Sequence, residues 1–131
     1  FVQMKIGHLL LSNYEKYWIL PELSLELNDK ILIPDLAIYK KANFDLGEDE
    51  IRITQIPLGV IEILSPKQNV GDLLIKAKYY FKAGVQSYWL VMPAFKAIFV
   101  YSNEEDYEVY KKKELLKDEV LDIELDLGKV F

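Results

Sequence analysis

The segment LGVIEIL, residues 58–64, constrains the fold more than any other part of the chain. It is almost entirely apolar, and Glu62 is its one charged residue. A run of this length and composition is typical of a β-strand that is covered on both faces. We therefore predict a sheet with other layers packed on both sides and a carboxylate within it.

Along the rest of the chain, the spacing of apolar residues alternates between the periods of strands and helices. Helices are predicted at residues 1–17 and 73–83, and strands at residues 23–27, 31–33, 36–39, 58–64, 88–92, 97–101 and 107–110. We expect Asp72 at the N-cap of the second helix and Gly84 after its last turn. The acidic tail, residues 118–126, should pack partly against the body. Strands, a helix and then more strands predict an α/β fold with a mixed (α+β) sheet.

Length and composition exclude several classes of protein. With 131 residues, of which 51% are hydrophobic, the chain has the size of one domain, residues 1–131, and can bury a core. It has no cysteine and one histidine, His8, which excludes disulfides and thiol catalysis and argues against a catalytic triad or a multi-histidine metal site. Any chemistry would have to come from carboxylates, lysines and hydroxyls.

The sequence also predicts the cellular location of the protein and the element in which the chain starts. No apolar run reaches the ~18 residues of a membrane span and no signal peptide is visible, so we expect a cytoplasmic protein. The first residue is Phe1 rather than methionine, and helical spacing starts at once. We therefore expect the chain to begin inside a helix, with a truncated N-terminus.

Glu62 is the first candidate for a functional residue. An unpaired charge on a buried strand is costly, and burial raises the pKa of a carboxyl group unless a cation or hydrogen-bond donors compensate. The structural alternatives are a salt-bridged glutamate in the core and an edge strand on which Glu62 faces water. We favour a functional carboxylate.

Asp35 is the second candidate, because it follows Pro34 at the entrance of the predicted strand 36–39. The structural alternative is an aspartate that caps a Pro–Asp turn. Two carboxylates on adjacent strands, with a free backbone carbonyl beside them, form an all-oxygen site suited to Mg²⁺ or Mn²⁺.

Lys76 is the third candidate. On a helical wheel it flanks the apolar stripe of the second helix, one turn before Tyr80, whereas Lys82 lies roughly opposite the stripe. From there its ammonium could reach a site at the end of the preceding strand. A solvated lysine, or an i,i+4 pair with Asp72, are the structural alternatives.

Four blocks stand in one order along the chain and support a family resemblance. They are IPDLAIY (33–39), GVIEILSP (59–66), D-x-x-x-K-x-x-x-Y (72–80) and AGVQSYWLV (83–91). They resemble the bacterial restriction-endonuclease-like family of the PD-(D/E)XK nuclease superfamily, over residues 31–101. The resemblance implies a restriction-endonuclease-like core, a four-strand mixed sheet flanked by helices, with a metal site at the split edge of the sheet.

The resemblance also implies roles for individual residues. Asp35 and Glu62 would bind Mg²⁺ or Mn²⁺, with the backbone carbonyl of Ile63 as a third ligand. The superfamily pattern expects a lysine two residues after the glutamate, where this chain has Leu64. In this family the lysine is supplied from the following helix, at the position of Lys76. Many members carry a histidine or an acid in the first helix, and none of residues 1–4 is either.

The implied activity is that of a metal-dependent endonuclease that hydrolyses DNA phosphodiester bonds. A net charge of −5 opposes binding to a polyanion, so we expect weak DNA binding of low specificity. We expect Lys40, Lys41 and Lys67 to form a local basic rim near the site.

Two other functions remain open, because a fold does not determine a function. One is a catalytically inactive nuclease-fold protein that serves as a binding or assembly module. The other is a structural protein that self-associates through an aromatic surface of Tyr14, Tyr17 and Trp18. A homodimer is expected from the family resemblance and from these aromatic residues.

Overall fold

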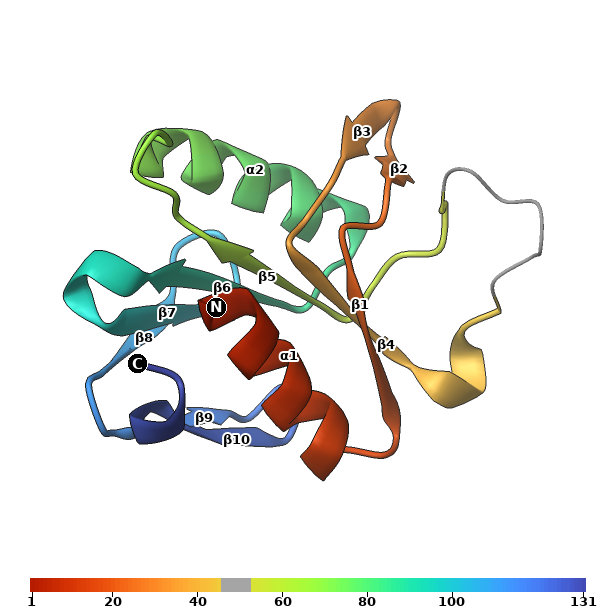
Figure 1. Cartoon of the computed structure of the whole chain (residues 1–131). Helices are drawn as coiled ribbons and strands as arrows, with labels where there is room; N and C mark the ends of the chain where they lie inside the picture. The colour runs from red at the N-terminus through yellow and green to blue at the C-terminus, as the bar shows by residue number, and fades with distance from the viewer. Residues whose placement is uncertain (46–52) are drawn as a thin grey trace.

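A six-stranded sheet forms the centre of the molecule (Figure 1). The computed structural model describes residues 1–45 and 53–131. The helices are α1 (Val2–Asn13) and α2 (Val70–Ala83), and the strands are β1 (Tyr17–Pro21), β2 (Leu25–Leu27), β3 (Lys30–Leu32), β4 (Leu36–Lys40), β5 (Gly59–Ile63), β6 (Ser87–Met92), β7 (Ala97–Tyr101), β8 (Tyr107–Lys111), β9 (Leu115–Asp118) and β10 (Ile123–Asp126). Within these ranges, neither helix combines the length and apolar character needed to span a membrane.

The sheet is mixed, with strand order β1-β4-β5-β6-β7-β8. Strands β5 and β6 run parallel, and the other neighbouring pairs run antiparallel. A parallel pair needs a long crossover connection, and α2 supplies it. The predicted mixed α/β sheet is therefore confirmed, although it has six strands rather than the four that the resemblance implied.

Both faces of the sheet are covered, as the apolar segment at residues 58–64 predicts. Helix α2 and the β2–β3 hairpin lie over one face, and α1 and the β9–β10 hairpin lie over the other (Figure 1). Alternate residues of β5 serve the two layers, because Val60 packs with the α2 layer and Ile61 with the α1 layer. Glu62, two residues after Val60, therefore points to the α2 side.

Asn69 and Gly84 define the ends of α2. The Asn69 side chain accepts a hydrogen bond from the Gly71 amide at 2.6 Å, so Asn69 is the N-cap and the prediction of Asp72 at this position is wrong. Asp72 lies in the first turn, where its charge complements the helix dipole. Gly84 has φ 113°, the left-handed conformation that ends a helix, as predicted.

Strand β1 was not predicted from the sequence. Helix α1 ends at Asn13, and β1 follows within a few residues, with Tyr17 only 2% exposed. Tyr17 therefore cannot belong to an exposed aromatic surface, whereas Trp18 is 41% exposed. The strand is too short for its alternation to stand out from the helical spacing that precedes it.

The acidic tail forms the β9–β10 hairpin, and a buried aspartate holds this hairpin to the sheet. Asp118 is 2% exposed. Its carboxylate accepts hydrogen bonds from the Ser87 hydroxyl, from Trp89 Nε1 at 2.7 Å and from the Leu121 amide at 3.0 Å. These bonds connect the hairpin to β6, so the tail is an integral layer of the fold.

Candidate metal centre

The candidate site lies where β4 and β5 separate. The antiparallel register pairs Leu36 with Ile61 at the first residue of β4. One residue beyond this pair, the same register sets Asp35 opposite Glu62, with both side chains on the face that α2 covers. Pro34, which has no N–H, precedes this point and limits the pairing. The two predicted acids, distant along the chain, therefore meet at the end of the β4–β5 pair.

Three other segments hold Asp35 in place. Its Oδ2 accepts a hydrogen bond from the Ile63 amide at 2.6 Å. Its backbone carbonyl accepts hydrogen bonds from Gln3 Nε2 of α1 at 3.1 Å and from the Glu22 amide at 3.2 Å. Among the described residues, no donor bonds to its second carboxylate oxygen, Oδ1. The carboxylate is thus oriented, with one oxygen available to a ligand.

The Ile63 backbone faces the same space as Asp35. Its amide donates to the Asp35 carboxylate, whereas the amide of the next residue, Leu64, donates to the Val91 carbonyl of β6 at 2.9 Å. In a strand the N–H and C=O of one residue point to the same side. The Ile63 carbonyl therefore points away from β6 and toward the gap beside Asp35.

Glu62 is the buried acid of the site. Its side chain is 3% exposed, and its Oε1 has no hydrogen-bond partner within the described part of the chain. Burial raises the pKa of the Glu62 carboxyl from its ordinary 4.5 to about 7; Lys76 and the Tyr80 hydroxyl act to lower it, and the Asp35 charge adds to the rise. An edge position facing water, one of the two structural alternatives, is therefore excluded.

Helix α2 brings Lys76 and Tyr80 to this site from one face. They are four residues apart, so they are neighbours on the helix surface. Lys76 is half-buried, and its positive charge acts on Glu62. Tyr80 is fully buried; its hydroxyl lies close enough to Glu62 to lower the pKa of that carboxyl, but it makes no hydrogen bond of standard geometry with the described residues. The spacing of apolar residues groups Tyr80 with Leu73 and Ala77 on one face of the helix and gives no sign of its polar end.

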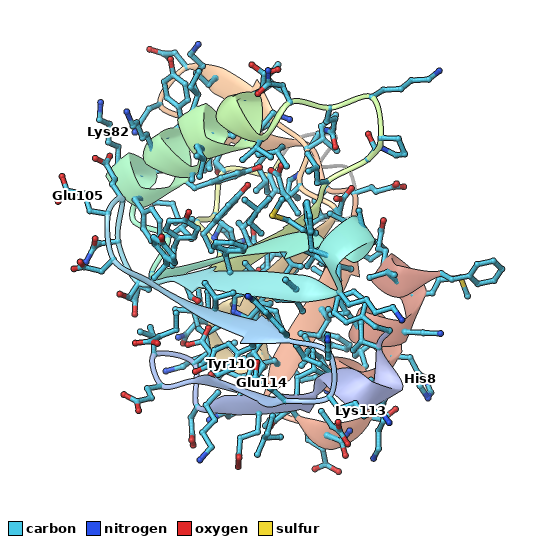
Figure 2. All side chains as sticks on the ribbon, turned by 90° about the vertical axis from the view of Figure 1, so that its left-hand side faces the viewer. His8, Lys82, Glu105, Tyr110, Lys113 and Glu114 are labelled. Atoms are coloured by element: carbon cyan, nitrogen blue, oxygen red, sulfur yellow. The ribbon has the colours of Figure 1, made fainter. Side chains whose placement is uncertain are left out.

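Other charged side chains lie outside the site. Lys40 is the last residue of β4, about 17 Å along the strand from Asp35, and Lys41 follows it. Lys41 Nζ lies 4.4 Å from the centre of the Trp18 ring. The predicted basic rim is therefore wrong for these two lysines. Figure 2 shows His8 on the outer surface of α1 and Lys82 directed into solvent at the end of α2, so neither competes for a role in the site.

The donor set fits a hard divalent cation. It consists of two carboxylates and one backbone carbonyl, all of them oxygen donors, and one carboxylate oxygen is buried without a partner in the described structure. The described residues contain no cluster of three or more His, Cys, Asp and Glu side chains of the kind that encloses a metal. This suits Mg²⁺, which keeps several waters and is held by one or two carboxylates together with substrate phosphates.

Comparisons with known proteins concern the family and the fold of the chain. A family model, Uma2, described as "Putative restriction endonuclease", matches residues 3–129. A crystal structure of "a putative nuclease belonging to DUF820 from Anabaena variabilis" is similar with a TM-score of 0.84 and 21% identity, over 99% of this chain and 78% of that chain. A cryo-EM structure of a DrdV–DNA complex is similar with a TM-score of 0.51 and 10% identity, over 94% of this chain and 10% of that one. No curated protein matches. At these identities the two likenesses concern the fold, which is of nuclease type.

Proposed function

The chain belongs to the Uma2 family of "putative restriction endonucleases", and from this premise we propose that it is a metal-dependent endonuclease that hydrolyses DNA phosphodiester bonds. One observation carries the proposal, the buried Glu62 carboxylate whose Oε1 lacks a partner among the described residues, beside Asp35. An unsatisfied buried polar group is costly and calls for an explanation. A divalent cation between the two acids would supply the missing partner.

In this proposal, Asp35, Glu62 and the Ile63 carbonyl hold Mg²⁺ or Mn²⁺. When bound, the ion would polarise the phosphoryl oxygen and make water a better nucleophile. The Ile63 amide fixes the Asp35 carboxylate in advance, so the acid need not reorganise when the ion and the substrate arrive. Ile63 thus serves the site with both of its backbone polar groups.

Lys76 would supply the positive charge of the reaction. Its half-buried ammonium acts on Glu62 from α2, the side that a scissile phosphate would share. A fixed cation stabilises the negative charge that develops on a phosphate in the transition state, and it can also orient the attacking water. Both roles require the ammonium to stay near the two acids.

DNA is the substrate that the comparisons support. The family is described as "Putative restriction endonuclease", and DrdV, which is similar in fold, is in a complex with DNA. The net charge of −5 opposes phosphate-driven binding, so we expect low affinity and low sequence specificity.

A plasmid-nicking assay tests the proposal. Wild type should nick a plasmid in Mg²⁺ or Mn²⁺ and not in a chelator. Glu62→Ala and Lys76→Ala should each lose about 100-fold or more in rate, whereas Lys82→Ala, an exposed lysine on the same helix, should keep the activity. Activity that resists the chelator or survives both substitutions would contradict the proposal.

Metal binding can be tested without turnover. Mg²⁺ or Mn²⁺ should raise the melting temperature of wild type. At a metal concentration 100 times the Kd, the free energy of unfolding should rise by about 2.7 kcal/mol. Asp35→Asn should abolish this shift. If neither metal nor substitution changes the melting curve and no nicking occurs, the catalytically inactive binding module is the better description.

A further inference from the structure

An apolar pocket adjoins the proposed metal centre. It has a volume of about 230 Å³ and lies at the carboxyl ends of β5 and β6, where Leu64, Pro66, Met92 and Phe95 are among its lining residues. Phe95 ends the 3-10 turn η2 (Pro93–Phe95) and is 69% exposed. An apolar pocket with an exposed aromatic ring on its wall has the kind of lining that ligand-binding sites use.

The pocket follows the site along the direction of β5. Leu64 follows Ile63 directly and is two residues beyond Glu62, so it lies on the same face about 6.6 Å further along the chain. Met92 ends β6, the parallel neighbour of β5. A nucleotide whose phosphate lies at Asp35 and Glu62 could thus reach the pocket with its own base or the next one.

The charges around the pocket match a nucleotide strand. Two exposed lysines, Lys67 and Lys96, each directly follow a lining residue, Pro66 and Phe95 respectively. This arrangement offers an apolar cavity for a base with cations beside it for the flanking phosphates. The volume is below the ~300–1,000 Å³ of pockets for drug-sized ligands, which suits a single ring system.

We propose that this pocket, the base pocket, takes an unpaired base of single-stranded DNA, so that the substrate is single-stranded or locally unpaired DNA rather than an intact duplex. The inference rests on the proposed function for the position of the phosphate. In a duplex the faces of the bases are stacked inside and cannot enter the pocket, whereas a single strand offers them for stacking on Phe95. Base stacking also provides affinity that does not depend on net charge, and this chain carries −5.

Fluorescence anisotropy with a short labelled oligonucleotide tests the inference. Binding is measured in a chelator to prevent cleavage, at one fixed low salt concentration, for the single strand and for its duplex. Wild type should bind the single strand more tightly. Phe95→Ala should weaken single-strand binding about 10-fold and leave duplex binding unchanged. Phe95 is exposed, so the variant should fold, and a melting curve checks this.

The matched control is Tyr107→Ala, which removes a 51% exposed aromatic ring from the edge strand β8. Tyr107 pairs with Tyr101, which pairs with Tyr88 near the start of β6, whereas the base pocket lies at the other end of that strand. It should bind both forms of DNA like wild type. Equal affinity for the two forms, or a single-strand affinity that does not change in Phe95→Ala, would overturn the inference.

Cleavage assays separate this inference from the endonuclease proposal. Negatively supercoiled plasmid, in which strand separation is favoured, should be nicked faster than the same plasmid linearised. Equal cleavage of both forms, unchanged in Phe95→Ala, would refute the base pocket and leave the endonuclease. Single-strand binding that depends on Phe95, without any cleavage, would support the pocket and refute the endonuclease.

Discussion

Two buried carboxylates on opposite faces of the sheet show how differently this fold treats charge. Glu62 is 3% exposed and Asp118 is 2% exposed, so burial does not distinguish them. Asp118 accepts hydrogen bonds from Ser87, Trp89 and Leu121. Glu62 Oε1 accepts no hydrogen bond from the described residues, and burial raises the pKa of its carboxyl to about 7.

Hydrogen bonding, rather than burial, therefore distinguishes a structural acid from a candidate functional one. Three donors arranged around Asp118 compensate for the loss of water, and the result is a joint between the β9–β10 hairpin and β6. At Glu62 the free-energy cost of burying the carboxylate is not compensated in the same way. An uncompensated buried carboxylate next to a second acid and a lysine indicates a site that a ligand completes.

The largest effect is expected at the satisfied acid. Asp118→Ala leaves two buried side-chain donors and the Leu121 amide without a partner, so the free energy of unfolding should fall by about 3 to 5 kcal/mol. Chemical denaturation measures this, and Glu119→Ala, an exposed neighbour, should change stability by no more than about 0.5 kcal/mol. A similar small loss in both variants would show that Asp118 is not a joint of the fold.

The second effect has the opposite sign. Glu62 has a pKa of about 7 in the folded protein and an ordinary value of 4.5. Between these pH values the folded state holds a proton that the unfolded state has lost, so this group lowers stability as the pH rises from about 4.5 to 7. Glu62→Gln removes the titration and should stabilise the metal-free protein by about 2 to 3 kcal/mol at pH 8, and by less than about 1 kcal/mol at pH 5.

Denaturant unfolding of wild type and Glu62→Gln at pH 5 and pH 8, in a chelator, gives the required difference. A stability difference that is the same at both pH values would contradict the raised pKa. The two acids would also lose their contrast if Glu62→Gln destabilised the protein at pH 8 as Asp118→Ala does.

Sequence patterns predicted much of the site because its signals are local. Glu62 stands out as a charge within an apolar strand, and Asp35 is marked by the proline before it. The end of α2 at Gly84 could be predicted because the left-handed conformation is a property of that single residue. The meeting of Asp35 with Glu62 depends on the strand register, which the family resemblance implied and the residues alone did not determine.

The remaining features depend on partners that are distant in sequence. Asp118 is in an acidic tail, and its side-chain donors are 29 and 31 residues away on β6, so no local pattern marks it as buried. Lys40 and Lys41 are close to Asp35 in sequence, but the direction of β4 carries them to its far end. In the same way, the Tyr80 hydroxyl gains its meaning from Glu62, across the space between helix and sheet.

The smallest effect is expected when a tyrosine near each acid is replaced by phenylalanine. The same substitution should lower stability near Asp118 and raise it near Glu62. The Tyr17 hydroxyl donates to the Leu121 carbonyl at 2.7 Å, in the turn that Asp118 holds, so Tyr17→Phe should lower stability by about 1 kcal/mol. The Tyr80 hydroxyl is buried next to Glu62 and makes no hydrogen bond of standard geometry with the described residues, so Tyr80→Phe should raise stability by about 1 kcal/mol at pH 5, where Glu62 is protonated and gains nothing from the hydroxyl as a charge. Denaturant unfolding in a chelator measures both. Equal losses of stability would mean that the Tyr80 hydroxyl has a hydrogen-bond partner in solution. Because Glu62 is its polar neighbour, that partner would be the Glu62 carboxyl group. Glu62 would then be hydrogen-bonded, as Asp118 is, and would need no metal ion.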